Sequence, residues 1–125
     1  MIVGSGVDMI EIERIAETLA RYGDRFCQRI YRPAEIQYCR RKRNAAERFA
    51  ARFAAKEAIS KAFGTGIGAA LGWQDMEIRR KESGEPFVVL HGKGEELFKL
   101  RKAKRLLISL SHTQNYAAAT AVLEG

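Results

Sequence analysis

Residues 49–63 read "FAARFAAKEAISKAF". On a helical wheel at about 100° per residue, the large apolar side chains fall in one sector and four alanines fall roughly opposite. These two sets are Phe49, Phe53, Ile59 and Phe63, and Ala51, Ala55, Ala58 and Ala62. A helix that is apolar on two sides is typical of an element sandwiched inside a fold. The stretch therefore predicts a central helix on which the other elements pack.

Polar side chains interrupt this helix. Glu57 and Lys61 occupy a narrow sector between the two apolar sides, beside the small Ala50 and Ala54, while Lys56 borders the aromatic side. One interpretation is an i,i+4 ion pair that stabilises the helix by about 0.2–0.5 kcal/mol. A partly buried pair, however, costs desolvation that it often does not recover. The second interpretation is a hollow above Ala50 and Ala54 in which Glu57 and Lys61 hold a metal ion with a phosphate.

The segments before this helix read as a strand and two helices. Residues 1–10 combine glycines with β-branched and apolar residues, which favours a strand, and residues 11–23 show helical spacing that ends at Gly23. Residues 31–43 predict a second helix, with Pro33 in its first turn and the basic run Arg40–Arg43 at its end.

The segments after it favour strands. The helix should run over residues 45–63 and stop at "GTGIG". Residues 73–80 and 86–92 predict a hairpin, residues 93–104 a helix with Leu97, Phe98 and Leu100 on its apolar side, and residues 106–111 and 116–123 a final strand pair. The expected fold is α+β, with antiparallel strands packed against a central helix. A chain of 125 residues suits a single domain over residues 1–125.

Composition limits the possible classes of protein. Hydrophobic residues make up 46% of the chain and charged residues 30%, as in soluble globular proteins. No apolar run approaches the roughly 20 residues of a membrane span, and no signal peptide is evident, so we expect a cytoplasmic protein without a membrane partner. Cys27 and Cys39 lack zinc-site spacing and should be reduced thiols. The net charge of +7 favours an anionic partner, although a generic basic surface explains it equally well.

Asp8 is the second carboxylate of interest. It lies in "GSGVDMIEIERI", residues 4–15. Glu11 stands three residues later, so Asp8 could cap the following helix as part of a capping box, and the residues alone favour that role. Mg²⁺, however, typically binds one or two protein carboxylates and completes its octahedron with water and substrate phosphates. Asp8 and Glu57 would suffice for such a site if the fold brings them together.

Two of these segments carry a resemblance to a known family. "GVDMIEIERI" at 6–15 and "RFAARFAAKEAISKAFGTGI" at 48–67 resemble the two motifs of the holo-acyl-carrier-protein synthases, the bacterial 4′-phosphopantetheinyl transferases. The chain length, the "SGEP" turn and the closing "SLSHTQNYAAATAVL" are also similar to the family. The resemblance implies a compact subunit that assembles into a homotrimer with active sites at the subunit interfaces. It further implies transfer of 4′-phosphopantetheine from coenzyme A to a serine of apo acyl carrier protein, in fatty acid biosynthesis, with release of adenosine 3′,5′-bisphosphate.

The resemblance also implies roles for single residues. Asp8 and Glu57 match the family's ligands for Mg²⁺, and Lys61 matches a lysine that reaches the phosphates and neutralises or protonates the leaving group. The base that accepts the serine proton is either Glu57 or a metal-bound water. The remaining matches line the site of the coenzyme's 3′-phosphate or the docking surface for the acidic carrier protein: Gly64, Gly66, Ser111 and His112 for the former, and Arg14, Arg21 and Arg25 for the latter.

Two other functions compete with this one. The basic runs Arg40–Arg43 and Lys99–Arg105 could bind nucleic acid, since phosphate contacts dominate non-specific affinity. No zinc spacing, aromatic RNA-binding signature or helix-turn-helix pattern supports that reading, so no nucleic-acid partner is expected. The chain could also be an inactive trimeric binder of carrier proteins. The presence of Asp8, Glu57 and Lys61 argues against loss of activity.

Overall fold

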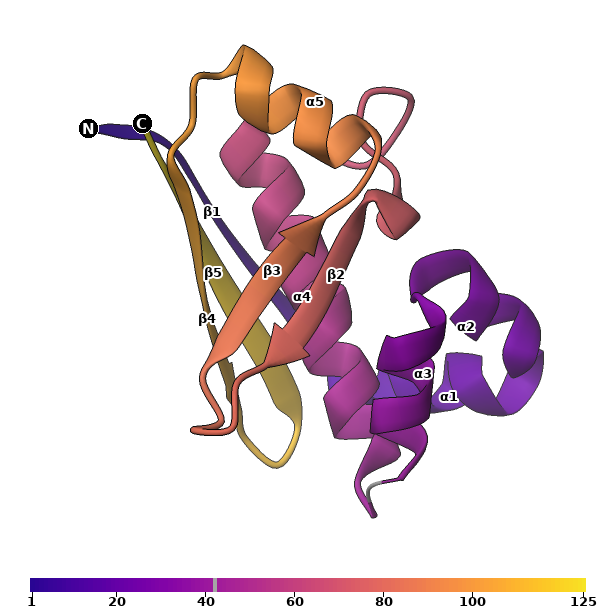
Figure 1. Ribbon diagram of the computed structural model, residues 1–125. Helices are drawn as coiled ribbons and strands as arrows, with labels where there is room; N and C mark the ends of the chain where they lie inside the picture. The colour runs from indigo at the N-terminus through magenta and orange to yellow at the C-terminus, as the bar shows by residue number, and fades with distance from the viewer. Residues whose placement is uncertain (42) are drawn as a thin grey trace.

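The structure is a computed structural model that describes residues 1–41 and 43–125. It contains two antiparallel sheets. The larger sheet has the strand order β1-β5-β4, and the smaller is the hairpin β2-β3. The bounds are β1 Ile2–Glu11, β2 Met76–Arg80, β3 Pro86–Leu90, β4 Arg105–His112 and β5 Tyr116–Glu124. Figure 1 shows the long helix α4, Ala45–Phe63, running between the hairpin and the larger sheet.

The other helices gather at the two ends of α4. Three short helices surround its N-terminal end, and α5 lies near its C-terminal end (Figure 1). Their bounds are α1 Ile12–Tyr22, α2 Asp24–Ile30, α3 Pro33–Arg40 and α5 Lys93–Leu100, and a 3₁₀ turn spans Trp73–Asp75. Among the described residues, no helix combines the length and the apolar character required to cross a bilayer.

The predicted fold class and the sandwiched central helix are confirmed. One buried cluster joins Ala58, Ile59 and Ala62 of α4 to residues of both sheets, including Met76 of β2 and Ala119 of β5. Both sides of α4 are therefore covered, as its two apolar sectors predicted. Because the helix lies inside the fold, the few polar side chains that it carries must either find buried partners or reach the surface.

Several local predictions were wrong. Helix α2 was not predicted, because its seven residues bury only Cys27 and Ile30, and one i,i+3 pair is too short a pattern to identify a helix. The helix predicted over 31–43 covers only Pro33–Arg40, and part of its basic run, Lys42, lies outside the described residues. The helix predicted to continue to residue 104 ends at Leu100, which is 75% exposed instead of packed.

Asp8 does not cap a helix. Strand β1 continues through Asp8, and α1 begins only at Ile12, with Glu11 at the N-cap position and no side-chain capping hydrogen bond. The capping-box interpretation is therefore wrong, because the strand extends three residues farther than a cap at Asp8 would allow. The Asp8 side chain is free for another role.

Lys56 is a structural residue at the centre of the fold. Its ammonium is fully buried and donates to Glu35 Oε1 and to the Ile30 carbonyl, each at 2.7 Å. Glu35 also accepts hydrogen bonds from the backbone N–H groups of Arg32 at 2.9 Å and Ile78 at 3.1 Å. Burial lowers the pKa of Lys56, although Glu35 opposes the shift. The pair links α2, α3 and β2 to α4, and loss of one partner would leave a buried charge.

Strand β1 lies directly on the backbone of α4. A Cβ added to Gly4 would sit 1.9 Å from the Ala62 carbonyl oxygen, and one added to Gly6 would sit 1.9 Å from the Ala58 carbonyl oxygen. Real Cβ atoms do not approach that closely, so only glycine fits at either position. The absence of these two side chains, together with the alanines of α4, sets the distance between the strand and the helix.

We therefore expect Gly6→Ala to destabilise the protein, because the added methyl must push β1 away from α4. The overpacking should lower the free energy of unfolding by about 2–3 kcal/mol, measured by urea denaturation. Gly68→Ala is the matched control, since nothing lies within 4 Å of its Cβ position and its φ is not positive. An equal loss in both variants would contradict the close contact.

Candidate active site

Three sequence-predicted residues meet where β1 crosses α4. Asp8 comes from the strand, and Glu57 and Lys61 come from successive turns of the helix. The Lys61 ammonium lies 3.3 Å from Asp8 Oδ1 and donates a hydrogen bond of 2.9 Å to the Val7 carbonyl. The tertiary structure thus brings Asp8 of the strand to Lys61, 53 residues away in sequence, and near enough to Glu57 to affect its pKa.

The electrostatics of this group favour a cation. Burial raises the pKa of Glu57, the Asp8 carboxylate raises it further, and Lys61 partly opposes both effects. The i,i+4 pair of Glu57 with Lys61 is not among the ion pairs of the described residues, and the lysine reaches Asp8 instead. The negative charge at Glu57 is therefore incompletely compensated within the chain.

Asp8 and Glu57 could hold one divalent ion. Among the described residues there is no group of three or more His, Cys, Asp or Glu placed to hold a metal. Two carboxylates are nevertheless a common protein contribution to Mg²⁺, which takes its other ligands from water and substrate phosphates. The donor set fits Mg²⁺, and a bound cation would oppose both the burial and the Asp8 repulsion that raise the pKa of Glu57.

The open space beside this group is not where the sequence placed it. Ala50 and Ala54 are fully buried, so no hollow lies above them, and that expectation was wrong. A pocket of about 630 Å³ adjoins Lys61 instead, over residues 5–7 of β1 and 120–122 of β5. The ammonium of Lys61 therefore stands between the carboxylates and a surface of the larger sheet.

The residues expected around the coenzyme's 3′-phosphate are far apart within one chain. Gly64 ends α4 in the left-handed conformation, with φ 81°, and Gly66 follows with φ 66°. His112 ends β4, where its Nε2 lies 3.5 Å from Glu47 Oε2 near the opposite end of α4. At 1.5 Å per residue, Glu47 and Gly64 are separated by about 25 Å along the helix. Ser111, beside His112, is exposed.

The three arginines expected to dock a carrier protein are all exposed. Arg14 and Arg21 lie on α1 and, seven residues apart, share one face of it, while Arg25 lies in the first turn of α2. Helix α1 begins four residues after Asp8. Three exposed arginines thus lie on the helices that follow the strand carrying one of the two carboxylates.

Sequence reasoning missed Arg101. Its guanidinium donates hydrogen bonds to the carbonyl of Phe63, at the end of α4, and to the carbonyl of Val3 in β1 at 3.0 Å. It ties together the two elements that carry the site. The basic composition of residues 99–105 gave no signal that distinguishes this inward-facing arginine from its exposed neighbours.

His91, for which the sequence suggested no role, also has a structural partner. Its Nε2 lies 2.8 Å from Glu77 Oε1, and Arg79 Nε lies 2.8 Å from the other carboxylate oxygen. Burial raises the pKa of Glu77, but the hydrogen bonds from Arg79 and His91 outweigh it and lower the pKa. These groups belong to the hairpin and not to the site at β1 and α4.

Comparison with known proteins agrees with this arrangement. Residues 4–121 match the family model described as the 4′-phosphopantetheinyl transferase superfamily. The chain is 51% identical to a holo-[acyl-carrier-protein] synthase from Koribacter versatilis and 46% identical to one from Solibacter usitatus. Each alignment covers 99% of both chains.

Solved structures give the same result. The crystal structure of holo-[acyl-carrier-protein] synthase from Neisseria meningitidis superposes with a TM-score of 0.93 at 30% identity, over 100% of both chains. The Helicobacter pylori enzyme, solved in complex with coenzyme A, superposes with a TM-score of 0.86 at 32% identity, over 96% of this chain and 99% of that one. With the match extending over nearly the whole chain and the two motif segments meeting at one site, this protein belongs to the 4′-phosphopantetheinyl transferase superfamily, among the holo-[acyl-carrier-protein] synthases.

Proposed function

We propose that the protein transfers 4′-phosphopantetheine from coenzyme A to a serine of an apo acyl carrier protein. The observation that carries this function is the meeting of Asp8, Glu57 and Lys61 where β1 crosses α4. Its relatives are named for this activity, and the Helicobacter pylori relative was solved with coenzyme A. In the reaction, the serine oxygen forms a bond to the β-phosphorus of coenzyme A. The bond from that phosphorus to adenosine 3′,5′-bisphosphate breaks.

Asp8 and Glu57 would hold Mg²⁺ in this reaction. When bound, the ion supplies charge neutralisation and orientation for the pyrophosphate. Lys61 stands 3.3 Å from Asp8 and is half exposed, so its ammonium can donate to a phosphate oxygen or to the leaving group. The serine proton would pass to Glu57 or to a metal-bound water.

The active site would be completed by a second subunit in a homotrimer. The outer face of the larger sheet exposes Val7, Met9 and Leu107 to 61%, 65% and 48%. Large apolar side chains exposed on one face support an interaction site there, and the pocket beside Lys61 includes Val7. Gly64 and His112, about 25 Å apart along α4 in one chain, could then serve a single coenzyme from neighbouring subunits.

The carrier protein would dock on Arg14, Arg21 and Arg25. All three are exposed, and an acidic partner complements the net charge of +7. Because α1 directly follows β1, docking beside α1 would place the acceptor serine near Asp8 of that strand. We assign the reaction to fatty acid biosynthesis in the cytoplasm, as the family resemblance implies.

Nucleic-acid binding is the less favoured function. Several arginines of the two basic runs are already paired: Arg40 with Asp24, Arg105 with Glu124, and Arg101 with backbone carbonyls. The charge left for phosphate contacts is smaller than the sequence suggested. The carboxylate group at β1 and α4 would also have no role in a nucleic-acid binder.

The direct test is intact mass spectrometry of an apo acyl carrier protein incubated with this protein, coenzyme A and Mg²⁺. We expect the carrier protein to gain the mass of one phosphopantetheine. EDTA should abolish this gain because it removes the Mg²⁺ ion, and Asp8→Ala should abolish it because it removes a proposed ligand of that ion. Asp24→Ala, a carboxylate on α2 that pairs with Arg40, should keep the activity. No gain with several carrier proteins would exclude the transferase function.

A titration of Glu57 tests the metal site without catalysis. By carboxyl ¹³C NMR, saturating Mg²⁺ should lower the pKa of Glu57, because the cation stabilises the ionised form. It follows that Mg²⁺ should bind more tightly as the pH rises through the pKa of Glu57. In Asp8→Asn the metal-free pKa should fall part of the way to its ordinary value of 4.5, since burial remains, and the Mg²⁺ effect should largely disappear. A pKa that does not respond to Mg²⁺ in the unmodified protein would argue against metal binding here.

Mixing of subunits tests the shared site. Asp8→Ala and His112→Ala should each be nearly inactive alone, but mixed trimers would contain one intact site per trimer. Random 1:1 mixing in a threefold ring should restore about a quarter of the original sites. Mixing Asp8→Ala with Glu57→Ala should restore none, because both residues lie in the same half of the site. Restoration in neither mixture would place the whole site within one chain.

A further inference from the structure

The last turn of α4, residues 60–63, carries Lys61 and ends the helix, so its four carbonyl groups must find partners outside the helix. Backbone N–H groups of the following turn donate to two of these carbonyls at 2.9 to 3.2 Å, and Gly4 of β1 packs against a third. The fourth, the carbonyl of Phe63, accepts a hydrogen bond from the guanidinium of Arg101. A cation at this position also offsets the partial negative charge of the helix C-terminus.

A second hydrogen bond of Arg101 reaches β1. Its Nη2 donates to the Val3 carbonyl at 3.0 Å. Val3 lies where the pairing of β1 with β5 skips one residue, between Ile2 and Gly4. A residue that is left out of a ladder needs another partner for its backbone groups. One guanidinium therefore satisfies a carbonyl of the helix and a carbonyl of the strand, which fixes the last turn of α4 against β1.

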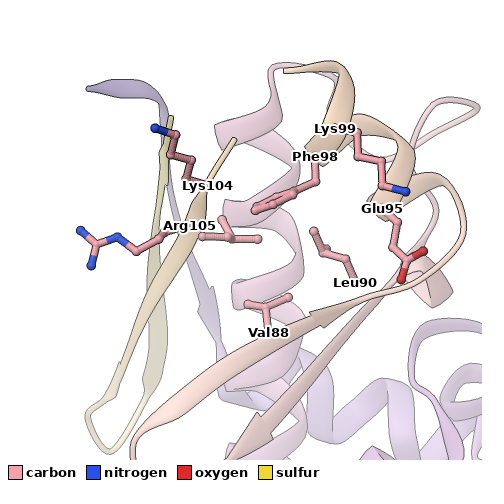
Figure 2. A pocket seen from close by; sticks show the side chains of 8 residues that line it. Val88, Leu90, Glu95, Phe98, Lys99, Lys104 and Arg105 are labelled. Atoms are coloured by element: carbon pink, nitrogen blue, oxygen red, sulfur yellow. The ribbon is translucent and has the colours of Figure 1, made fainter. Parts of the chain in front are cut away.

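Arg101 itself stands on a rigid support. It follows α5, whose Leu97 and Phe98 pack against the main core cluster, and its backbone N–H donates to the Leu97 carbonyl at 2.9 Å. Figure 2 shows Phe98 pointing from α5 into the groove beneath that helix, toward Val88 and Leu90 of β3. Arg101 is not among the residues that line this groove. The side chain that bonds both carbonyls is therefore held by a helix that the core anchors.

Lys61 is the site residue that this arrangement holds in place. Its backbone belongs to the last turn of α4, and its ammonium lies 3.3 Å from Asp8 and 2.9 Å from the Val7 carbonyl of β1. The Lys61 side chain is half exposed, so its position depends on the turn that carries it and on the strand that it contacts. Glu57 lies one turn earlier in the helix, and Asp8 lies in the strand, so neither carboxylate is carried by the last turn.

We propose that Arg101 is a positioning residue for Lys61 in the transfer reaction. It holds the last turn of α4 against β1, so that the ammonium meets the phosphates in one orientation. This inference rests on the proposed role of Lys61. It also separates Lys61 from the metal, because loss of Arg101 should slow the reaction without weakening the binding of Mg²⁺ to Asp8 and Glu57. Misplacement of a reacting group by 1 Å can cost about a hundredfold in rate.

The kinetics of Arg101→Ala test this separation. We expect kcat to fall by about tenfold or more, while calorimetry shows an unchanged dissociation constant for Mg²⁺. Arg101→Lys should recover only part of the loss, because an ammonium lacks the planar fork that reaches two carbonyls. Arg105→Ala, which removes an exposed arginine paired with Glu124, should leave kcat unchanged. An unchanged kcat in Arg101→Ala, or a loss of Mg²⁺ affinity as large as the loss of kcat, would overturn the positioning role.

A double-mutant cycle tests whether Arg101 acts through Lys61. In a Lys61→Ala background, Arg101→Ala should lower kcat by less than about twofold, because the residue that it positions is already absent. Equal losses in both backgrounds would show that Arg101 acts by another route. Failure of the proposed function is distinguishable from this result, because the unmodified protein would then transfer no phosphopantetheine.

Side-chain relaxation gives a test that does not depend on activity. The ¹³C order parameter at Cε of Lys61 should fall in Arg101→Ala, because the turn that carries it has lost its link to β1. The order parameter of Lys56, which is fully buried on the same helix, should not change. An unchanged order parameter at Lys61 in a folded Arg101→Ala or Arg101→Lys variant would contradict the proposal.

Discussion

The contact between the backbone of β1 and the backbone of α4 is the constraint on which the rest of the structure depends. Gly4 and Gly6 carry no Cβ, so the strand settles onto the carbonyl groups of Ala58 and Ala62. Two residues beyond Gly6, the same strand presents Asp8 to Lys61. The packing of the core and the assembly of the site thus share one cause. Arg101 holds the far end of this contact through Val3 and Phe63.

The charged side chains of the central helix α4 point in different directions. Lys56 points inward to a fully buried pair with Glu35, and that pair fastens three surrounding elements to the helix. Glu57, the next residue, points to the edge of β1, and Lys61 follows one turn later. Because consecutive residues of a helix are rotated by about 100°, the adjacent Lys56 and Glu57 reach different surroundings, a buried ion pair and the candidate site. The rigid burial of Lys56 also fixes the orientation of its neighbours, which a preorganised site requires.

Two surfaces of the fold leave apolar side chains in contact with water. On the outer face of the larger sheet Val7 and Met9 are exposed, and the pocket beside Lys61 adjoins Val7. The groove beneath α5 has apolar walls and charged residues at its rim. The main core cluster stands behind the groove, and the two carboxylates of the proposed active site are not among the residues that line it.

The sequence by itself determined the central helix and the two strand pairs, and its two motifs predicted Asp8, Glu57 and Lys61 as site residues. These are recorded in local periodicity and in short runs of residues. Only the tertiary structure decided that Asp8 lies over Lys61 instead of capping α1, that Lys56 turns inward, and that the space lies beside Lys61 instead of above the alanines. The physical reason is that each depends on how closely two distant segments approach. That distance is set by glycine and alanine packing across elements, which no local pattern specifies.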